Sequence, residues 1–203
     1  MALKRSRPAT EIRFQNAVLE LVAESGFAQL GVNLVAERAG SDKVLIYRYF
    51  GSFDGLLQSL ATSRSWLPSA HALCSALPDS PVRLLDELAL KVSRHVRSDP
   101  TSHQIALWRH ATKNPLTEAY SQEWKQLWRE IPKQIGAKLS YEDRKNWEAA
   151  CALLSLIVQA ELADGSLDSP SLQLICDQLV TPYGIAADEE ELDDPYALPT
   201  NLL

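Results

Sequence analysis

The sequence predicts an all-α protein of about nine helices. Apolar residues recur at intervals of three and four along nearly the whole chain, the spacing that gives a helix one buried face. No segment alternates apolar and polar residues as a half-buried strand does, and no Asn-Gly or Asp-Gly pair separates two β-branched runs. Five of the eight glycines lie between positions 26 and 55. This clustering indicates short helices joined by tight turns.

Helical spacing defines one segment before position 26 and five in the last two thirds of the chain. In the first segment the apolar positions from Phe14 to Val22 share one face, and Gly26 is placed to end the helix. Pro132 is expected to kink or interrupt a long helix, and Asp164-Gly165 to stop the next one. The five later segments start after Pro81 and then cover residues 101–113, 116–139, 141–163 and 170–181.

The composition indicates a globular chain without disulfides. The 203 residues are 46% hydrophobic and 23% charged, which supplies a buried core and excludes a disordered or fibrous protein. The three cysteines, Cys74, Cys151 and Cys176, are odd in number and widely spaced, so they are expected to be buried thiols in a reducing compartment. No apolar segment of a secretion signal follows the basic amino end, and no run reaches the roughly 18 apolar residues of a membrane span. A cytoplasmic protein is therefore expected, with no membrane partner.

Charge is unevenly distributed along the sequence. The net charge of −6 argues against indiscriminate binding to nucleic acid by the whole molecule. Residues 1–65 nevertheless hold eight basic and six acidic side chains, a net +2, which leaves −8 for the rest. No Lys or Arg follows Lys145, and residues 188–194 form an acidic run. Any contact with a polyanion is therefore expected near the amino end.

Residues 31–50 have the pattern of a helix-turn-helix, whose second helix can enter a DNA major groove. Gly40 can adopt the left-handed conformation that ends the first short helix, and Asp42 can cap the next one. Ile46 and Phe50, four residues apart, are expected to anchor this second helix to the core. Lys43, Val44, Tyr47 and Arg48 fall on its other faces, where they can meet phosphates and base edges.

Residues 10–58 resemble the DNA-binding head of the tetracycline-repressor (TetR) family. The similarity lies in the Ala17-Val18, Leu21-Val22 and Gly26-Phe27 steps, in Val35-Ala36, Ala39-Gly40 and Tyr47-Arg48-Tyr49-Phe50, and in Leu56-Leu57. The resemblance implies a dimeric repressor with three head helices and a helical body that binds a small molecule and dimerises through its last two long helices. It implies base contacts by Lys43, Val44 and Leu45, phosphate contacts by Tyr47, Arg48 and Tyr49, and an approach to DNA by Asn33 and Val32.

Three positions depart from the family pattern. Ser41 replaces a valine of the turn, Gly31 replaces a hydroxyl residue at a helix cap, and Phe53 replaces a lysine that commonly meets phosphate. In addition, the apolar Val44 and Leu45 can recognise only thymine methyl groups in the major groove. Further specificity would come from Lys43, from DNA shape and from the basic residues of the amino end, Lys4, Arg5 and Arg7. These features also suggest an alternative, a helical ligand-binding or interaction protein that has lost sequence-specific DNA binding.

Aromatic residues of the body suggest a pocket for a small apolar or aromatic effector. Ordinary core packing is the alternative interpretation of each tryptophan. His103 and His110 lie seven positions apart, but no further Cys or carboxylate completes a metal site, and no catalytic motif occurs. We therefore expect no metal, no cofactor and no enzymatic activity. The expected ligand-binding residues are His103, Trp108, Tyr120, Trp124 and Trp128.

Two apolar-faced helices near the carboxyl end are expected to form a four-helix bundle between two subunits. Leu154, Ile157, Val158, Leu174 and Leu179 are the candidate interface residues, with burial inside one chain as the alternative. The predicted function is a ligand-responsive DNA-binding transcriptional regulator, a repressor that binds a pseudo-palindromic operator on double-stranded DNA as a homodimer. The predicted domains are a helix-turn-helix domain over residues 1–52, a helical ligand-binding and dimerisation domain over 53–185 and an acidic tail over 186–203.

Overall fold

The computed structural model describes residues 6–75, 77, 81–136, 141–165, 171, 174–176 and 178. This part of the chain is helical and contains no strand, which confirms the all-α prediction. Its helices are α1 (Arg7–Ser25), α2 (Val32–Arg38), α3 (Val44–Phe50), α4 (Phe53–Ala61), α5 (Ala70–Cys74), α6 (Pro81–Ser98), α7 (Pro100–Trp108), α8 (Pro115–Gly136) and α9 (Tyr141–Asp164).

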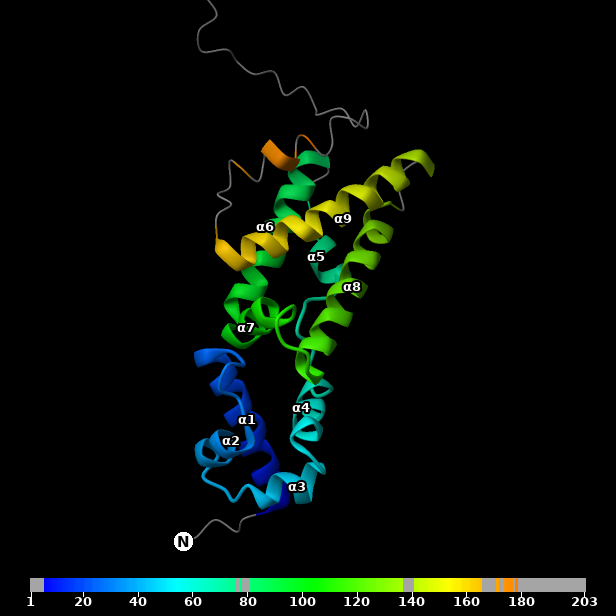
Figure 1. Ribbon diagram of the computed structural model, residues 1–203. Helices are drawn as coiled ribbons and strands as arrows, with labels where there is room; N and C mark the ends of the chain where they lie inside the picture. The colour runs from blue at the N-terminus through cyan, green and yellow to red at the C-terminus, as the bar shows by residue number, and fades with distance from the viewer. Residues whose placement is uncertain are drawn as a thin grey trace, which may run out of the picture.

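The helices form an elongated molecule with a small head, α1–α3, at one end and a larger body, α4–α9, at the other (Figure 1). Within the body, α9 crosses α6 and α8 and packs against both. Helix α4 packs against α1 and α3 of the head and also against α8. The carboxyl-terminal half of α1 meets α7, so head and body touch along two routes.

The core of the head follows the predicted apolar face of α1. Phe14, Val18 and Val22 are fully buried, and Ile46 of α3 is equally buried beside them. The rings of Phe14 and Phe50 meet edge to face with centroids 6.3 Å apart. These contacts fix the orientation of α3, because a helix of only two turns has little stability of its own.

Several predicted helix boundaries need correction. Helix α8 continues through Pro132 to Gly136, so the proline, which lies in its last turns, does not interrupt it. The segment predicted over 101–113 ends at Trp108, and α5 escaped prediction because five residues are too few for a periodic pattern. Helix α9 ends before Gly165, as predicted. Of the segment 170–181, Ser171, residues 174–176 and Gln178 are helical, and the rest lies outside the described residues.

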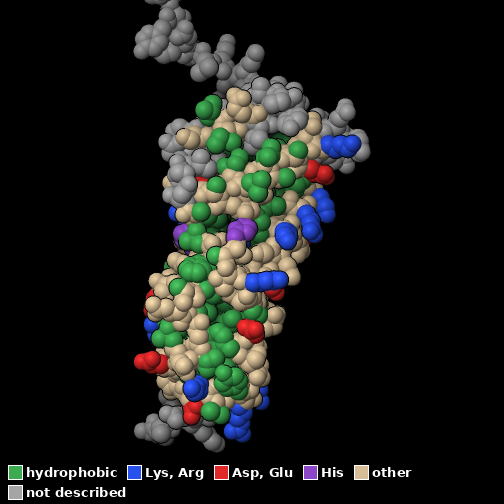
Figure 2. All heavy atoms as spheres, viewed as in Figure 1, with side chains coloured by type: hydrophobic (Ala, Val, Ile, Leu, Met, Phe, Trp, Pro, Cys, Tyr) green, Lys and Arg blue, Asp and Glu red, His purple; other side chains and the backbone are tan. Residues whose placement is uncertain are grey.

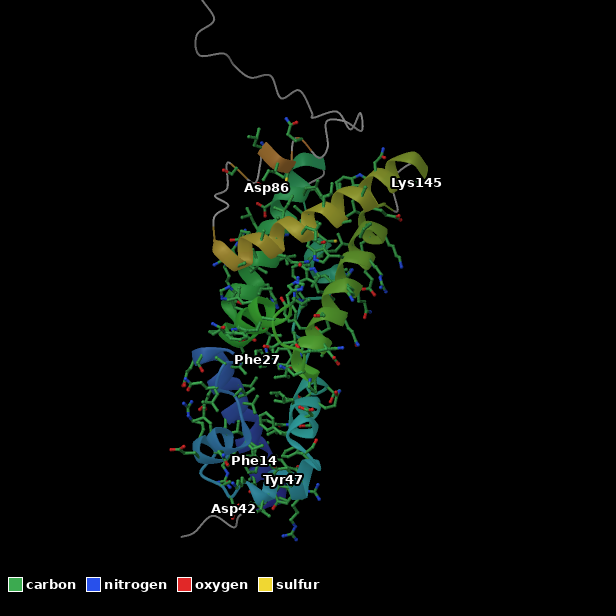
Figure 3. All side chains as sticks on the ribbon, viewed as in Figure 1. Phe14, Phe27, Asp42, Tyr47, Asp86 and Lys145 are labelled. Carbon is green, nitrogen blue, oxygen red and sulfur yellow. The ribbon has the colours of Figure 1, made fainter. Side chains whose placement is uncertain are left out.

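The first route between head and body is the contact of α1 with α7. Gly26 ends α1 with a φ of +64°, and a Cβ atom at this position would overlap the indole of Trp108. The neighbouring Phe27 meets the same indole edge to face, with ring centroids 6.4 Å apart. Figure 3 shows Phe27 where the head meets the body. The hydroxyl of Thr101 also donates a hydrogen bond to the Leu19 carbonyl, at 3.2 Å.

The second route runs through the segment that follows α4. The Glu123 carboxylate of α8 accepts hydrogen bonds from the backbone N–H groups of Trp66 and Leu67, at 2.8 and 3.2 Å. Arg64 forms an ion pair of 2.6 Å with Asp99, the residue that caps α7. Burial opposes ionisation of Asp99, but the Ser102 hydroxyl and the Arg64 guanidinium together lower its pKa below the usual value. The end of α4 is thereby held to both α7 and α8.

Replacing Gly26 by alanine should destabilise the protein more than replacing Gly40. Both glycines have positive φ, which costs a side chain roughly 1–2 kcal/mol, but only Gly26 faces an occupied space. Overpacking against Trp108 should add roughly 1–3 kcal/mol. Denaturant unfolding of Gly26→Ala and Gly40→Ala measures the difference. Equal losses of unfolding free energy would show that the α1–α7 contact adjusts without cost, whereas adding Trp108→Ala to Gly26→Ala should remove the excess.

Candidate DNA-binding surface and ligand pocket

The turn between α2 and α3 is built as the sequence predicts. Gly40 has a φ of +56°, and its N–H donates to the Glu37 carbonyl at 3.0 Å. The Asp42 carboxylate accepts a hydrogen bond of 2.9 Å from the Val44 N–H, which satisfies a free donor at the start of α3. Gly31 caps α2 without a side-chain hydrogen bond, as expected of a glycine. The turn therefore presents α3 at a fixed angle to α2.

An ion-pair cluster that sequence reasoning missed ties α2 to α1. The guanidinium of Arg38 makes two hydrogen bonds to the Glu24 carboxylate, at 2.7 and 2.8 Å, and a longer one of 3.4 Å to Glu20. The hydrogen bonds from Arg38 lower the pKa of Glu24. The charges were visible in the sequence, but their pairing depends on the crossing of α1 and α2, which helical periodicity does not give.

The outward face of α3 carries most of the predicted DNA-binding residues. Val44 and Tyr47 are 60% and 53% exposed, which is unusual for large apolar or aromatic side chains, and Lys43 and Arg48 are also exposed. The Lys43 ammonium donates a 3.1 Å hydrogen bond to the exposed Asn33 side chain of α2. Figure 3 shows Tyr47 and Asp42 at the end of the head farthest from the body. Val44 and Tyr47 are therefore open to solvent in the described part of the chain.

Two of the predicted contact residues are less accessible than the others. Leu45 is half-buried and packs against the core of the head. Tyr49 is also half-buried, and the guanidinium of Arg7 lies 5.1 Å from its ring centroid. Phe53, the departure at a phosphate-contact position, is half-buried at the start of α4. The exposed apolar surface of α3 is therefore formed by Val44 and Tyr47.

A pocket of about 460 Å³ opens in the body where the end of α7, α8 and α9 meet. Trp124 and Trp128 form its aromatic wall, with ring centroids 5.8 Å apart. The guanidinium of Arg109 lies 4.7 Å from the Trp124 ring centroid and 5.8 Å from that of the buried Tyr120. The lining residues are Arg109, His110, Ser121, Trp124, Lys125, Trp128, Arg129, Ala152, Ser155 and Gln159.

The predicted ligand-binding residues divide into two groups. Trp124 and Trp128 line the pocket, and Tyr120 stacks on Trp124 behind the wall, with centroids 6.2 Å apart. Trp108 and His103 do not line this pocket. The Trp108 indole packs against the end of α1, and His103 Nε2 lies 3.1 Å from the Leu162 carbonyl oxygen. Helical spacing identified the aromatic residues but did not show which neighbouring helix each one faces.

The predicted dimer-face residues differ in their exposure. Leu154 and Val158 are buried in the core of their own chain. Ile157 is half-buried, Leu174 is exposed, and Leu179 lies outside the described residues. Helix α9 carries apolar residues around much of its circumference, so spacing alone did not separate its inner face from its outer one. Among the described side chains of α9, the large apolar ones that are exposed are Leu153 and Leu156.

Other sequence expectations concern the cysteines, metals and membranes. All three cysteines are free; Cys151 and Cys176 are buried and Cys74 is half-buried, and burial raises the pKa of Cys151 to about 12. In the described part of the chain, no three His, Cys, Asp or Glu side chains are grouped so that they could hold a metal ion. Among the same residues, no helix combines the length and the apolar character needed to cross a membrane.

Comparison with known proteins agrees with this arrangement. Residues 16–60 match the model of the family described as bacterial regulatory proteins, tetR family. None of the curated proteins compared with the chain matches it. Among solved structures, NalD, the secondary repressor of the MexAB-OprM multidrug efflux pump in Pseudomonas aeruginosa, is 21% identical with a TM-score of 0.53, and the match covers 89% of this chain and 96% of NalD.

Two further solved structures have the same fold. RolR, in complex with resorcinol, is 19% identical with a TM-score of 0.52, over 89% of this chain and 90% of RolR. A TetR-like transcriptional regulator from Rhodococcus sp. RHA1 is 17% identical with a TM-score of 0.53, over 90% of this chain and all of the regulator. The match over residues 16–60 indicates a DNA-binding domain of the tetR family, and the matches to solved structures show that the chain has the fold of TetR-like regulators.

Proposed function

We propose that this regulator is a repressor that binds DNA as a dimer through α3 and is released when a small molecule enters the body pocket. One observation carries the ligand-responsive part of the proposal. Arg109 lines the pocket and directly follows Trp108, which contacts the head at the end of α1. Trp124 also lines the pocket and directly follows Glu123, which holds the segment after α4. A ligand that moves either lining residue therefore moves a contact of the head.

The outward face of α3 supplies the DNA-binding chemistry. Lys43 and Arg48 are exposed cations at opposite ends of the helix, and cations of this kind bind phosphates or guanine edges. The exposed Val44 can contact a thymine methyl group. Asn33, hydrogen-bonded to Lys43, adds an amide from α2 to the same surface. These groups suit a helix that lies in the major groove.

Dimerisation would place two such helices on one DNA duplex. Leu153 and Leu156 form an exposed apolar patch on α9, and exposed patches of large apolar side chains mark interaction sites. A second copy that covers this patch would form a two-fold interface. The two heads would then read half-sites about 34 Å apart, or a multiple of this distance.

Structural relatives support the regulatory assignment at the level of the fold. NalD is a repressor, and RolR was solved with resorcinol, a small aromatic molecule. In the present chain the pocket combines an aromatic wall with polar groups, the usual composition of a small-molecule site. Release from DNA would be a population shift, in which the ligand binds the DNA-incompetent arrangement of heads more tightly.

A second candidate function is ligand binding without sequence-specific DNA recognition. The half-buried Leu45 and Phe53 favour it, because these positions, assigned to base and phosphate contacts in the family, offer no polar group here. The acidic net charge also weakens attraction to DNA. The two functions differ in one measurable property, the preference for a particular DNA site over random duplex.

Replacing Lys43 or Tyr47 by alanine should weaken DNA binding by about tenfold each, because a specific contact is typically worth 1–3 kcal/mol. Fluorescence anisotropy with DNA from upstream of the protein's own gene, and with random duplex, measures affinity over a range of salt concentrations. A phosphate contact by Lys43 predicts a salt slope smaller by about one in Lys43→Ala. Lys113→Ala is the control, since Lys113 is an exposed lysine of the body. Unchanged affinities, or equal binding of all duplexes by the unmodified protein, would support the second candidate.

Replacing Glu123 by alanine should loosen the end of α4 without unfolding the protein. The Trp66 and Leu67 N–H groups lose their acceptor, which should lower the unfolding free energy by roughly 1–3 kcal/mol and speed exchange of these two amide hydrogens. The same variant should shift DNA affinity, since α4 packs against α1 and α3. Glu118→Ala is the matched control on α8, because Glu118 makes only a 3.8 Å ion pair with Lys113 at the surface. Exchange at Trp66 and Leu67 that is identical in both variants would exclude the coupling through Glu123.

A further inference from the structure

We propose that the pocket between α7, α8 and α9 binds an aromatic carboxylate, a flat ring that carries an anionic group, and that Arg109 holds the anion. The inference rests on the proposed function, since it names the class of ligand for the same pocket. The sequence predicts a small apolar or aromatic effector. The present proposal keeps the aromatic ring and specifies in addition that the ligand carries a negative charge.

The charge of the pocket is opposite to that of the chain. Its described lining includes the cations Arg109, Lys125 and Arg129 and no Asp or Glu, in a protein with a net charge of −6. Figure 2 shows Lys and Arg side chains gathered along the flank formed by α8. Such a concentration of one sign raises the local concentration of ions of the opposite sign. A cationic ligand would be repelled from this pocket.

Arg109 is the member of this group that most needs a counter-ion. It is half-buried, and burial lowers its pKa from the usual value. Its Nε donates to His110 Nε2 at 3.1 Å, while its terminal amino groups have no hydrogen-bond acceptor and no carboxylate partner among the described residues. A guanidinium presents its terminal N–H groups as a fork that matches a carboxylate. The fork of Arg109 therefore offers a bidentate site for one.

The aromatic part of the ligand is indicated by the wall of the pocket. Trp124 and Trp128 are 4% and 7% exposed, so their rings form a fixed surface on which a flat ligand can pack. Their indole Nε1–H groups are buried without an acceptor in the described structure. A buried donor of this kind is costly unless a partner arrives. Carboxylate oxygens on a ring beside Arg109 would offer acceptors on the same wall.

The matched probes 2-naphthoate and 2-naphthalenemethanol share one ring system and differ in charge. Isothermal titration of each into the full-length protein should show the acid binding at least about tenfold more tightly, because a hydrogen bond to a charged group contributes roughly 1.5–3 kcal/mol. Arg109→Gln should abolish this preference and leave the affinity for the alcohol unchanged. Arg109→Lys should retain part of the preference, because the charge remains.

Lys133→Gln is the matched control for charge, since Lys133 is an exposed cation of α8 that does not line the pocket. This variant should bind both probes as the unmodified protein does. Equal affinity for acid and alcohol, no detectable binding of either at millimolar concentration, or an equal loss of preference in Arg109→Gln and Lys133→Gln would overturn the proposal. The alcohol affinity and thermal unfolding of Arg109→Gln report whether its pocket is intact.

The proposed regulatory function is tested separately, by measuring the affinity for DNA in the presence of 2-naphthoate. Binding of the acid with loss in Arg109→Gln, but with no change in DNA affinity, would contradict the ligand-responsive repressor and leave the anion site standing. DNA binding that prefers one site, together with equal affinity for the two probes, would contradict the anion site and leave the regulator standing.

Discussion

The contact between Gly26 and Trp108 determines how the head of this protein sits on its body. The indole occupies the space that a side chain at position 26 would fill, and the left-handed backbone of the glycine turns the chain out of α1 at the same point. The body therefore contacts the end of α1 through close packing of the Trp108 indole. Glu123 makes the second attachment, through two backbone N–H groups that follow α4. Because the two attachments use different helices of the body, a relative movement of α7 and α8 would turn the head.

Both helices also form the pocket, which explains how one small site could control a distant surface. Arg109 at the end of α7 lies over Trp124 of α8, so the two helices meet in a cation–π contact at the pocket. An anion that draws the guanidinium away from the indole would change the spacing of α7 and α8. Coupling of this kind requires a chain of packed groups with two arrangements, and the path is short here, one residue on each helix. The electrostatics agree, because exposed cations lie at both sites, Lys125 and Arg129 at the pocket and Lys43 and Arg48 at the end of the head.

The sequence was sufficient for the local structure of the head and insufficient for the packing of the body. The apolar face of α1, the left-handed Gly40 and the Asp42 cap were all predicted, since each depends on residues within a few positions in the chain. Tertiary contacts decided the rest. Leu154 and Val158 face inward and Leu153 and Leu156 outward on a helix with apolar residues on both sides, and Trp108 packs on the head instead of lining the pocket. The role of Glu123 depends on partners more than fifty residues away, so spacing could not reveal it.

Ligand binding in the pocket and DNA binding by the head are proposed to be thermodynamically coupled, and linkage between the two affinities gives the most direct test. The affinity of 2-naphthoate can be measured for the free protein and for the protein saturated with its preferred DNA. If the two sites are coupled, DNA must weaken binding of the acid by the same factor by which the acid weakens binding of DNA. A typical coupling predicts a factor of roughly 5 to 150. Identical affinities for the acid with and without DNA would show that the pocket and α3 act independently, and would contradict the account.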